Sequence, residues 1–357
     1  MKKFIKALSL ILCTMFLCSC NNEDALLNES SDNYMTNPFD DIKKPESSLV
    51  VETLPPFDDS SDDSINDGDE DFAKYQTGYF FSDYSINGDK TVSYTGEDIN
   101  LSFTCDLSGE IYDGELGFMA FVNGVPQKLS YNGSEKSELA CVRQKAGTVD
   151  RITLSFTPEI TEEYSKEEKL SVTIMTITHP SYKPRENYYG FGNAHTGMFF
   201  KKFYIRPETS LEIIPSIDFS TDYRSHLASG KTLAEYDLDV SQINGTNMIN
   251  LYDSSFEKRE LTLEKDSDKL QIGVKMYGGE ADNYNVYIYK NNERVSPAMA
   301  VDVKEGYFCT FVATLDNVHK GDIIYLVEVP LKDSEKGTNV RKSTSIVVRE
   351  ESKDAER

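Results

Sequence analysis

The sequence predicts an all-β fold, with two β-sandwich domains in tandem after a disordered acidic tether. Three observations support this prediction. Beyond residue 76, apolar and polar residues alternate in short runs with period two, which is typical of strands with one buried face. Few stretches have the periodicity of an amphipathic helix. The strand-like runs of the first half also recur in the same order in the second half, as expected of two related domains.

The chain begins with the features of a secretory signal, which we assign to residues 1–19. Lys2, Lys3 and Lys6 form a basic start. The apolar run that follows, from about Ala7 to Leu17, is too short to span a membrane.

The residues at the end of this run are Leu17-Cys18-Ser19-Cys20, which resemble the lipobox of bacterial lipoproteins. The resemblance implies cleavage before Cys20 and attachment of diacylglycerol to its sulfur. Two acyl chains hold a protein firmly to a bilayer. We therefore expect the mature chain at the cell membrane, lipid-anchored through Cys20 and facing the extracytoplasmic side. An ordinary cleaved signal with a chance cysteine is the alternative.

Residues 20–75 form the lipidated linker. This segment is rich in Asp, Glu, Asn and Ser and lacks apolar periodicity, so we expect it to be disordered. The whole chain has 60 acidic and 37 basic residues and a formal net charge of −23. Such a charge repels phosphate backbones, which excludes nucleic acid as a partner. Residues 351–357 form a charged C-terminal tail.

We place the first β-sandwich domain at residues 76–207. The run Glu115–Val122 is apolar on both faces, and Asn123-Gly124 follows it. This dipeptide predicts a tight hairpin, because both residues tolerate positive φ. The other expected strands are Tyr79–Ile86, Asp98–Cys105, Ile152–Phe156, Leu170–Ile177 and Met198–Ile205.

We place the second β-sandwich domain at residues 208–350, with the boundary between Pro207 and Pro215. Its strand-like runs match those of the first domain in form and order, although chance similarity among strands is an alternative. The matched pairs are Asn285–Asn292 with Gly117–Gly124, Tyr307–Leu315 with Ile152–Phe156, Lys320–Pro330 with Glu168–Ile177, and Ser343–Arg349 with Met198–Ile205.

The alternating pattern from Gly78 to Arg349 is similar to that of immunoglobulin-like modules in bacterial surface proteins. The resemblance implies two tandem immunoglobulin-like β-sandwich domains. It transfers a fold class and no functional residues. The chain has no Trp, so it lacks the core tryptophan of antibody domains.

Three cysteines lie beyond the signal and Cys20, namely Cys105, Cys141 and Cys309. The odd number argues against a disulfide framework. Cys105 and Cys141 either pair in an oxidising compartment or lie buried as small apolar residues. The chain has no Cys-x-x-Cys spacing and its histidines are scattered, so we expect neither a metal site nor a cofactor.

The sequence contains no catalytic motif that we can identify. It has no Gly-x-Ser-x-Gly elbow, no His-Glu-x-x-His and no Walker loop. Carboxylates are too abundant to single out a glycosidase-like pair. We therefore expect a protein that is not an enzyme.

One segment has the composition of a binding loop. It lies between the strand ending near His179 and the strand beginning near Met198, in a glycine-rich stretch with aromatic and hydrogen-bonding side chains. The alternative is that the aromatic rings fold back and cap the end of the sandwich. The candidate ligand-binding residues are Tyr188, Tyr189, Phe191, Asn193 and His195.

These observations favour a non-catalytic cell-surface lipoprotein whose β-sandwich modules bind or space an extracellular partner, either a protein or a glycan. The alternative is a carbohydrate-binding surface lipoprotein that uses the aromatic loop around Tyr188–His195. The absence of Trp, the best stacking surface, counts against this alternative.

Overall fold

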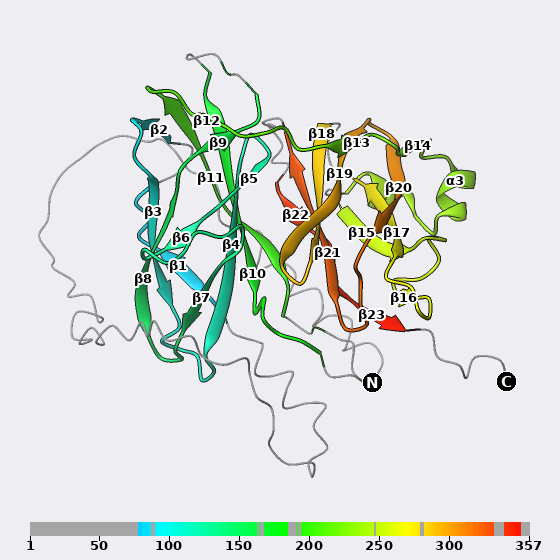
Figure 1. The fold of residues 1–357 in the computed structure, drawn as a ribbon, viewed down its shortest axis with the longest axis horizontal. Coiled ribbons are helices and arrows are strands. Elements are labelled where there is room, and N and C mark those ends of the chain that lie inside the picture. The colour runs from blue at the N-terminus through cyan, green and yellow to red at the C-terminus, as the bar shows by residue number, and fades with distance from the viewer. Residues whose placement is uncertain are drawn as a thin grey trace, which may run out of the picture. The chain divides into compact units, whose positions relative to one another are not determined.

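The computed structural model describes residues 78–350 except 87–89, 163, 165–167, 185–190, 192–193, 246–247, 279–281 and 332–338, all within one compact unit (Figure 1). The all-β prediction is confirmed, because nearly all regular structure in these residues is strand, arranged as β-sandwiches. The expected signal peptide, acidic linker and C-terminal tail lie outside the described residues. None of the helices in the described part is long and apolar enough to cross a membrane.

The first β-sandwich has one sheet with the order β1-β3-β8-β6 and another with the order β2-β11-β10-β4. Both β5 and β7 pair with the outer edge of β4. The order corresponds to strands A-B-E-D facing G-F-C in an immunoglobulin sandwich. The bounds are β1 Phe80–Ser82, β2 Thr91–Tyr94, β3 Ile99–Asp106, β4 Gly114–Val122, β5 Val125–Gln127, β6 Ser130–Tyr131, β7 Ala140–Gln144, β8 Val149–Phe156, β9 Glu159–Ile160, β10 Leu170–Thr178 and β11 Gly197–Pro207.

The core of the first sandwich follows from the period-two pattern of its strands. Leu101, Phe103 and Cys105 alternate along β3 and are fully buried between the sheets. The Phe103 ring lies 5.5 Å from that of Phe118 in β4 and 4.8 Å from that of Phe200 in β11. Because these rings come from both sheets, the first sandwich has a hydrophobic core of its own.

The second β-sandwich has the sheet order β13-β19-β18-β21-β23-β16, with β22 also paired to β21, and a facing sheet β14-β20-β17-β15. Its core is a separate cluster that includes Ile272, Val286 and Phe311. The bounds are β13 Phe219–Ser220, β14 Arg224–Leu227, β15 Met248–Asp253, β16 Leu261–Leu263, β17 Leu270–Tyr277, β18 Asp282–Lys290, β19 Glu293–Val303, β20 Tyr307–Leu315, β21 Ile323–Pro330, β22 Arg341–Lys342 and β23 Ile346–Glu350.

The strand pairing confirms the tandem repeat. Strand β4 lies beside β10, and its predicted counterpart β18 lies beside β21. The closing strands also agree, since β11 pairs in parallel with β2 and β23 pairs in parallel with β16. The predicted hairpin turn is present at Asn123-Gly124, with φ of 45° and 82°, and Asn291-Asn292 forms the equivalent turn with φ of 51° and 69°. Positive φ at both positions is the geometry of a type I′ turn.

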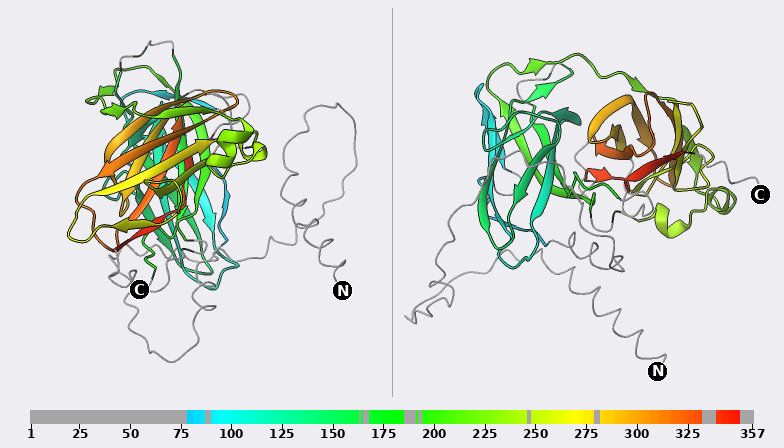
Figure 2. Two further views of the ribbon diagram at one scale, coloured as in Figure 1. Left: turned by 90° about the vertical axis from the view of Figure 1, so that its right-hand side faces the viewer. Right: turned by 60° about the horizontal axis from the view of Figure 1, so that its bottom comes forward.

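Two short helices, which the sequence analysis did not anticipate, cover the outer face of the β14-β20-β17-β15 sheet (Figure 2). They are α3 (Gly230–Glu235) and α4 (Val240–Ile243). Each begins with a capping box, at Ser229 and at Asp239. Leu233 of α3 packs there with the buried residues Tyr277 and Phe308 of the sheet beneath.

The segment after β11 is paired to both sandwiches. Strand β12 (Glu212–Ile213) pairs in parallel with β9 of the first sandwich. Farther along, β13 pairs with β19 and β14 pairs with β20, both in the second sandwich. The chain is therefore paired to the first sandwich just before it crosses and to the second just after it.

A third hydrophobic cluster, which we call the junction, joins the outward faces of the two sandwiches. Met119, Phe121, Met175 and Ile177 of β4 and β10 pack there against side chains of β18 and β21. The Phe121 ring stacks 6.2 Å from that of Tyr287. The second sandwich contributes Tyr287, Tyr289, Tyr325, Val327 and Val329.

Candidate functional site

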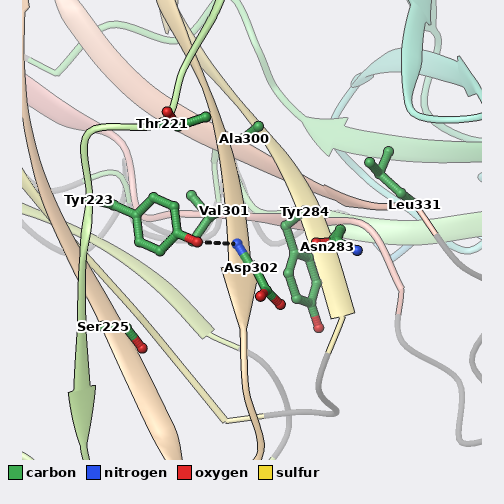
Figure 3. A pocket seen from close by; sticks show the side chains of 9 residues that line it. All are labelled: Thr221, Tyr223, Ser225, Asn283, Tyr284, Ala300, Val301, Asp302 and Leu331. Atoms are coloured by element: carbon green, nitrogen blue, oxygen red, sulfur yellow. Dashed lines mark hydrogen bonds between the residues drawn. The ribbon is translucent and has the colours of Figure 1, made fainter.

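The second sandwich has an open groove at one edge, which we call the Tyr223 groove (Figure 3). Its volume is about 470 Å³. The lining comes from the residues between β13 and β14, from β14 itself, from β18 and β19, and from the residue that follows β21. The lining residues are Thr221, Tyr223, Ser225, Asn283, Tyr284, Ala300, Val301, Asp302 and Leu331.

The position of Tyr223 follows from the topology of the sandwich edge. Strand β13 pairs with β19 only as far as Ser220, and β14 pairs with β20 in the facing sheet. The residues between them cross from one sheet to the other. The backbone N–H of Asp302 lies beyond the end of β13, and it donates to the Tyr223 hydroxyl at 3.2 Å. Tyr223 therefore satisfies an edge-strand donor while its ring packs against the core.

Asn283 and Asp302 occupy opposite positions on the paired strands β18 and β19. Their side chains therefore project from the same face of the sheet at cross-strand distance. The Asn283 side chain is exposed and that of Asp302 is half-buried. Among the groove-lining residues that the structure describes, Asp302 is the only one with a formal charge. The groove thus combines an aromatic ring, an amide and a single carboxylate.

The predicted aromatic loop is described in part. Tyr188, Tyr189 and Asn193 lie outside the described residues. Phe191 and His195 are buried, with 9% and 4% of their surface exposed. Their rings lie 4.6 Å apart, and Phe191 also meets the ring of Tyr182 edge-on at 6.2 Å. The structure therefore places Phe191 and His195 inside the protein, away from the Tyr223 groove.

His195 belongs to a directed hydrogen-bond network that crosses the junction. Its Nε2 lies 2.9 Å from the Tyr182 carbonyl, which can only accept, so Nε2 carries the proton. Its Nδ1 therefore accepts from the Ser345 hydroxyl at 3.2 Å. The ammonium of Lys342 donates to Ser345 Oγ at 2.8 Å and to the His195 carbonyl at 2.8 Å. It also lies 4.4 Å above the ring of Tyr325.

The two ionisable side chains of this network have pKa values far below their ordinary ones. Burial lowers the pKa of His195 to about 3, and the neighbouring Lys342 lowers it further. Burial also lowers the pKa of Lys342 to about 7. His195 is therefore neutral at physiological pH, which its role as a hydrogen-bond acceptor requires.

A second groove, with a volume of about 440 Å³, lies along the junction between β7 and the β18–β19 turn. Glu138 and Arg294 line it and form an ion pair, with Arg294 Nη2 2.8 Å from Glu138 Oε1 and Nε 3.1 Å from Oε2. Cys141 also lines this groove. This ion pair holds one sandwich to the other at the rim of the junction.

The described cysteines are unpaired. Cys105 lies in the core of the first sandwich, whereas Cys141 packs against the junction and Cys309 lies in the core of the second sandwich. The structure therefore favours the interpretation of buried thiols over a Cys105–Cys141 disulfide. In the part of the chain that the structure describes, no three His, Cys, Asp or Glu side chains converge as metal ligands would.

Sequence reasoning did not identify Tyr223, Asn283 or Asp302. Each lies in a run of ordinary strand or turn composition, and their proximity depends on the pairing of β18 with β19 and on the path of the residues after β13. The one available signal was Tyr223 itself, an aromatic residue in a polar stretch next to the predicted domain boundary.

Comparisons with known proteins assign the chain neither a family nor a function. No family model matches the chain, and no curated protein matches it either. Among solved structures, the crystal structure of CBD12 from CALX1.2 shares 10% sequence identity with the chain. The match covers 73% of this chain and 96% of that one, with a TM-score of 0.20. At that TM-score the similarity carries no argument about the fold or the site.

Proposed function

We propose that the chain is a non-catalytic lipoprotein and that its two β-sandwiches together form one rigid unit that binds an extracellular partner. The lipobox resemblance at Leu17-Cys18-Ser19-Cys20 supports anchoring through Cys20 at the extracytoplasmic face of the cell membrane. The acidic linker of residues 20–75 would hold the sandwiches away from the lipid surface. Its composition is typical of an extended chain.

The junction is the observation that carries this proposal. Apolar rings of both sandwiches pack in a common cluster, and the hydroxyl of Tyr287 donates to the Gly124 carbonyl at 2.7 Å. The Glu138–Arg294 ion pair and the His195 network add polar contacts. A protein whose modules only act as spacers on flexible linkers would not require such an interface between them. A rigid pair favours binding over spacing, because it fixes the grooves relative to each other.

The arrangement of nucleophiles supports the non-catalytic part of the proposal. Ser345 and His195 are within hydrogen-bond distance, as a nucleophile and its base would be. Both are buried, however, and neither lines the two grooves described above. The low pKa of His195 also makes it a poor base near neutral pH. We assign the pair a structural role at the junction.

The proposal can be tested on the full chain in a bacterial host. Labelled palmitate should enter the wild-type protein and not the Cys20→Ala variant, and external protease should digest the anchored protein on intact cells lacking an outer barrier. The mature Cys20→Ala chain should then be retained by isolated envelope material or by secreted polymers. Equal labelling of the wild-type and Cys20→Ala chains would contradict a lipid anchor at Cys20. Absence of retention on every material tested would contradict a binding role.

A further inference from the structure

We propose that the Tyr223 groove binds a neutral, hydroxyl-rich ligand of the saccharide class. This inference rests on the proposed binding function and assigns it a site. The groove is distinct from the aromatic loop that the sequence indicated, and it lies in the second sandwich between the segment after β13 and the paired strands β18 and β19 (Figure 3).

The hydrogen-bonding capacity of the groove suits hydroxyl groups. The Tyr223 oxygen accepts from the Asp302 N–H, so its own proton remains free to donate. No hydrogen bond among the described residues engages the side chains of Asn283 and Asp302. Asn283 therefore offers a donor and an acceptor, and Asp302 offers acceptors. A sugar hydroxyl both donates and accepts, so it can use each of these groups.

The apolar part of the lining suits the face of a sugar ring. Tyr223 contributes an aromatic ring, and Ala300 and Leu331 contribute aliphatic surface. Leu331 is held near the groove by its backbone, whose N–H donates to the Asn283 carbonyl at 2.9 Å. The volume of about 470 Å³ lies within the range of about 300–1,000 Å³ that small-ligand pockets occupy. One or two sugar rings fit such a space.

Charge decides against anionic ligands. Asp302 is the only charged residue among the described residues of the lining, and the whole chain carries a formal net charge of −23. Both features repel phosphates, sulfated glycans and uronic acids. A cationic ligand would gain from Asp302 and from the negative net charge, but its ammonium could not accept from Asn283 or Tyr223, and its binding would weaken steeply with salt. A neutral saccharide uses the amide and the tyrosine as well, which is why we favour it.

The test uses the mature chain with Cys20→Ala and a panel of neutral oligosaccharides, namely fragments of glucan, xylan, mannan and chitin, measured by calorimetry and by chemical-shift changes. We expect at least one member to bind with an affinity that varies little between low and high salt. Asn283→Ala and Asp302→Asn should each weaken that binding by about tenfold, the effect of losing one good hydrogen bond.

Asp268→Asn is the matched control. Asp268 is exposed, lies outside the groove and undergoes the same change of charge, so this variant should bind like the wild type. Tyr223→Phe removes the free proton and keeps the ring, and it should also weaken binding. Because Tyr223 packs against the core, its effect is read together with thermal melting, whereas Asn283→Ala alters an exposed side chain.

The outcomes separate this inference from the proposed function. Saccharide binding that is unchanged in Asn283→Ala and Asp302→Asn would overturn the groove assignment and leave the binding function standing. Retention on envelope material without binding to any panel member would do the same. Salt-sensitive binding of a cationic peptide in place of the saccharides would also overturn it. Loss of retention on every material would contradict the binding function itself.

Discussion

The hydroxyl of Tyr287 in the second sandwich donates a hydrogen bond to the carbonyl of Gly124 in the first, with an oxygen–oxygen distance of 2.7 Å. Gly124 is the second residue of the β4–β5 hairpin turn, and its carbonyl is available because the turn has no strand partner there. Asn285 supports the contact from β18, since its amide nitrogen lies 3.3 Å from the Tyr287 oxygen. The β4–β5 hairpin of the first sandwich therefore also contacts and positions the second.

Substituting Gly124 by Ala should destabilise the protein by about 1–3 kcal/mol, mostly through the backbone. The residue has a φ of 82°, which L-amino acids with a side chain disfavour. A Cβ atom would also meet Leu331 Cδ2 of the other sandwich, the end of a side chain that is 40% exposed and can turn away at a smaller cost. Urea unfolding at constant pH measures the change.

Gly133→Ala is the matched control for this prediction. Gly133 also follows an Asn in a turn and has a φ of 83°, but a Cβ atom there would meet nothing within 4 Å. Gly133→Ala should therefore lower the free energy of unfolding by only about 1–2 kcal/mol, the cost of a side chain at positive φ. Equal destabilisation by the two variants would show that the close approach at Gly124 has no energetic weight.

Acidification should destabilise the protein through His195. Its pKa is about 3 in the folded protein against an ordinary value of 6.5, so the unfolded chain binds more protons between these values. The stabilising contribution is complete above pH 6.5 and is lost progressively as the pH falls toward 3. In His195→Gln, which can also accept from Ser345 and donate to the Tyr182 carbonyl, the free energy of unfolding should change less between pH 7 and pH 5. An identical pH profile would exclude His195 as the titrating group.

The thiols should be unreactive in the native protein. Burial raises the pKa of Cys105 and Cys141 to about 12 and that of Cys309 to about 11, so little thiolate is present at pH 8. A thiol reagent added to the mature Cys20→Ala chain should react slowly until denaturant is added, and then titrate all three groups. A single reactive thiol after denaturation would instead reveal a Cys105–Cys141 disulfide.

The two halves of the chain should recognise each other when separated. Each sandwich has its own core, so polypeptides 76–207 and 208–350 should fold, but each would expose its side of the junction. Mixed together, they should form a one-to-one complex on size-exclusion chromatography. Arg294→Glu should weaken association by about tenfold through repulsion from Glu138, and Glu138→Arg in the other half should restore it. Halves that remain monomeric when mixed would refute a stable junction.

The fold was readable from the sequence because its signals are local. Strand alternation, the Asn123-Gly124 turn and the matched runs each depend on residues near one another in the chain, and the structure has the corresponding strands in corresponding places. The sequence did not predict helices α3 and α4 because each is only one or two turns long. A helix this short contains too few residues to show a recognisable apolar periodicity. Their capping residues, Ser229 and Asp239, were the only local sign.

The junction and the groove were harder to predict because they depend on contacts distant in sequence. The run Glu115–Val122 is apolar on both faces, and the structure shows why, since Phe118 faces the core of the first sandwich while Met119 and Phe121 face the second. The apolar character of both faces indicated that the outer face of this strand is covered, but it did not identify the second sandwich as the element that covers it. Asn283 and Asp302 had no comparable signal, because a polar residue at an outward strand position is the ordinary case.

The shared cluster also bears on how such a chain can evolve. Tandem sandwiches commonly behave as interchangeable units that duplication and recombination move between proteins. Here Tyr287, Tyr289 and Tyr325 are buried in a cluster to which both modules contribute side chains. In another protein without the first sandwich, the second sandwich would expose this aromatic surface to solvent, and the exposed surface would promote non-specific association. We therefore expect the two sandwiches to be inherited as a pair, with substitutions on either side of the cluster constrained by the residues opposite.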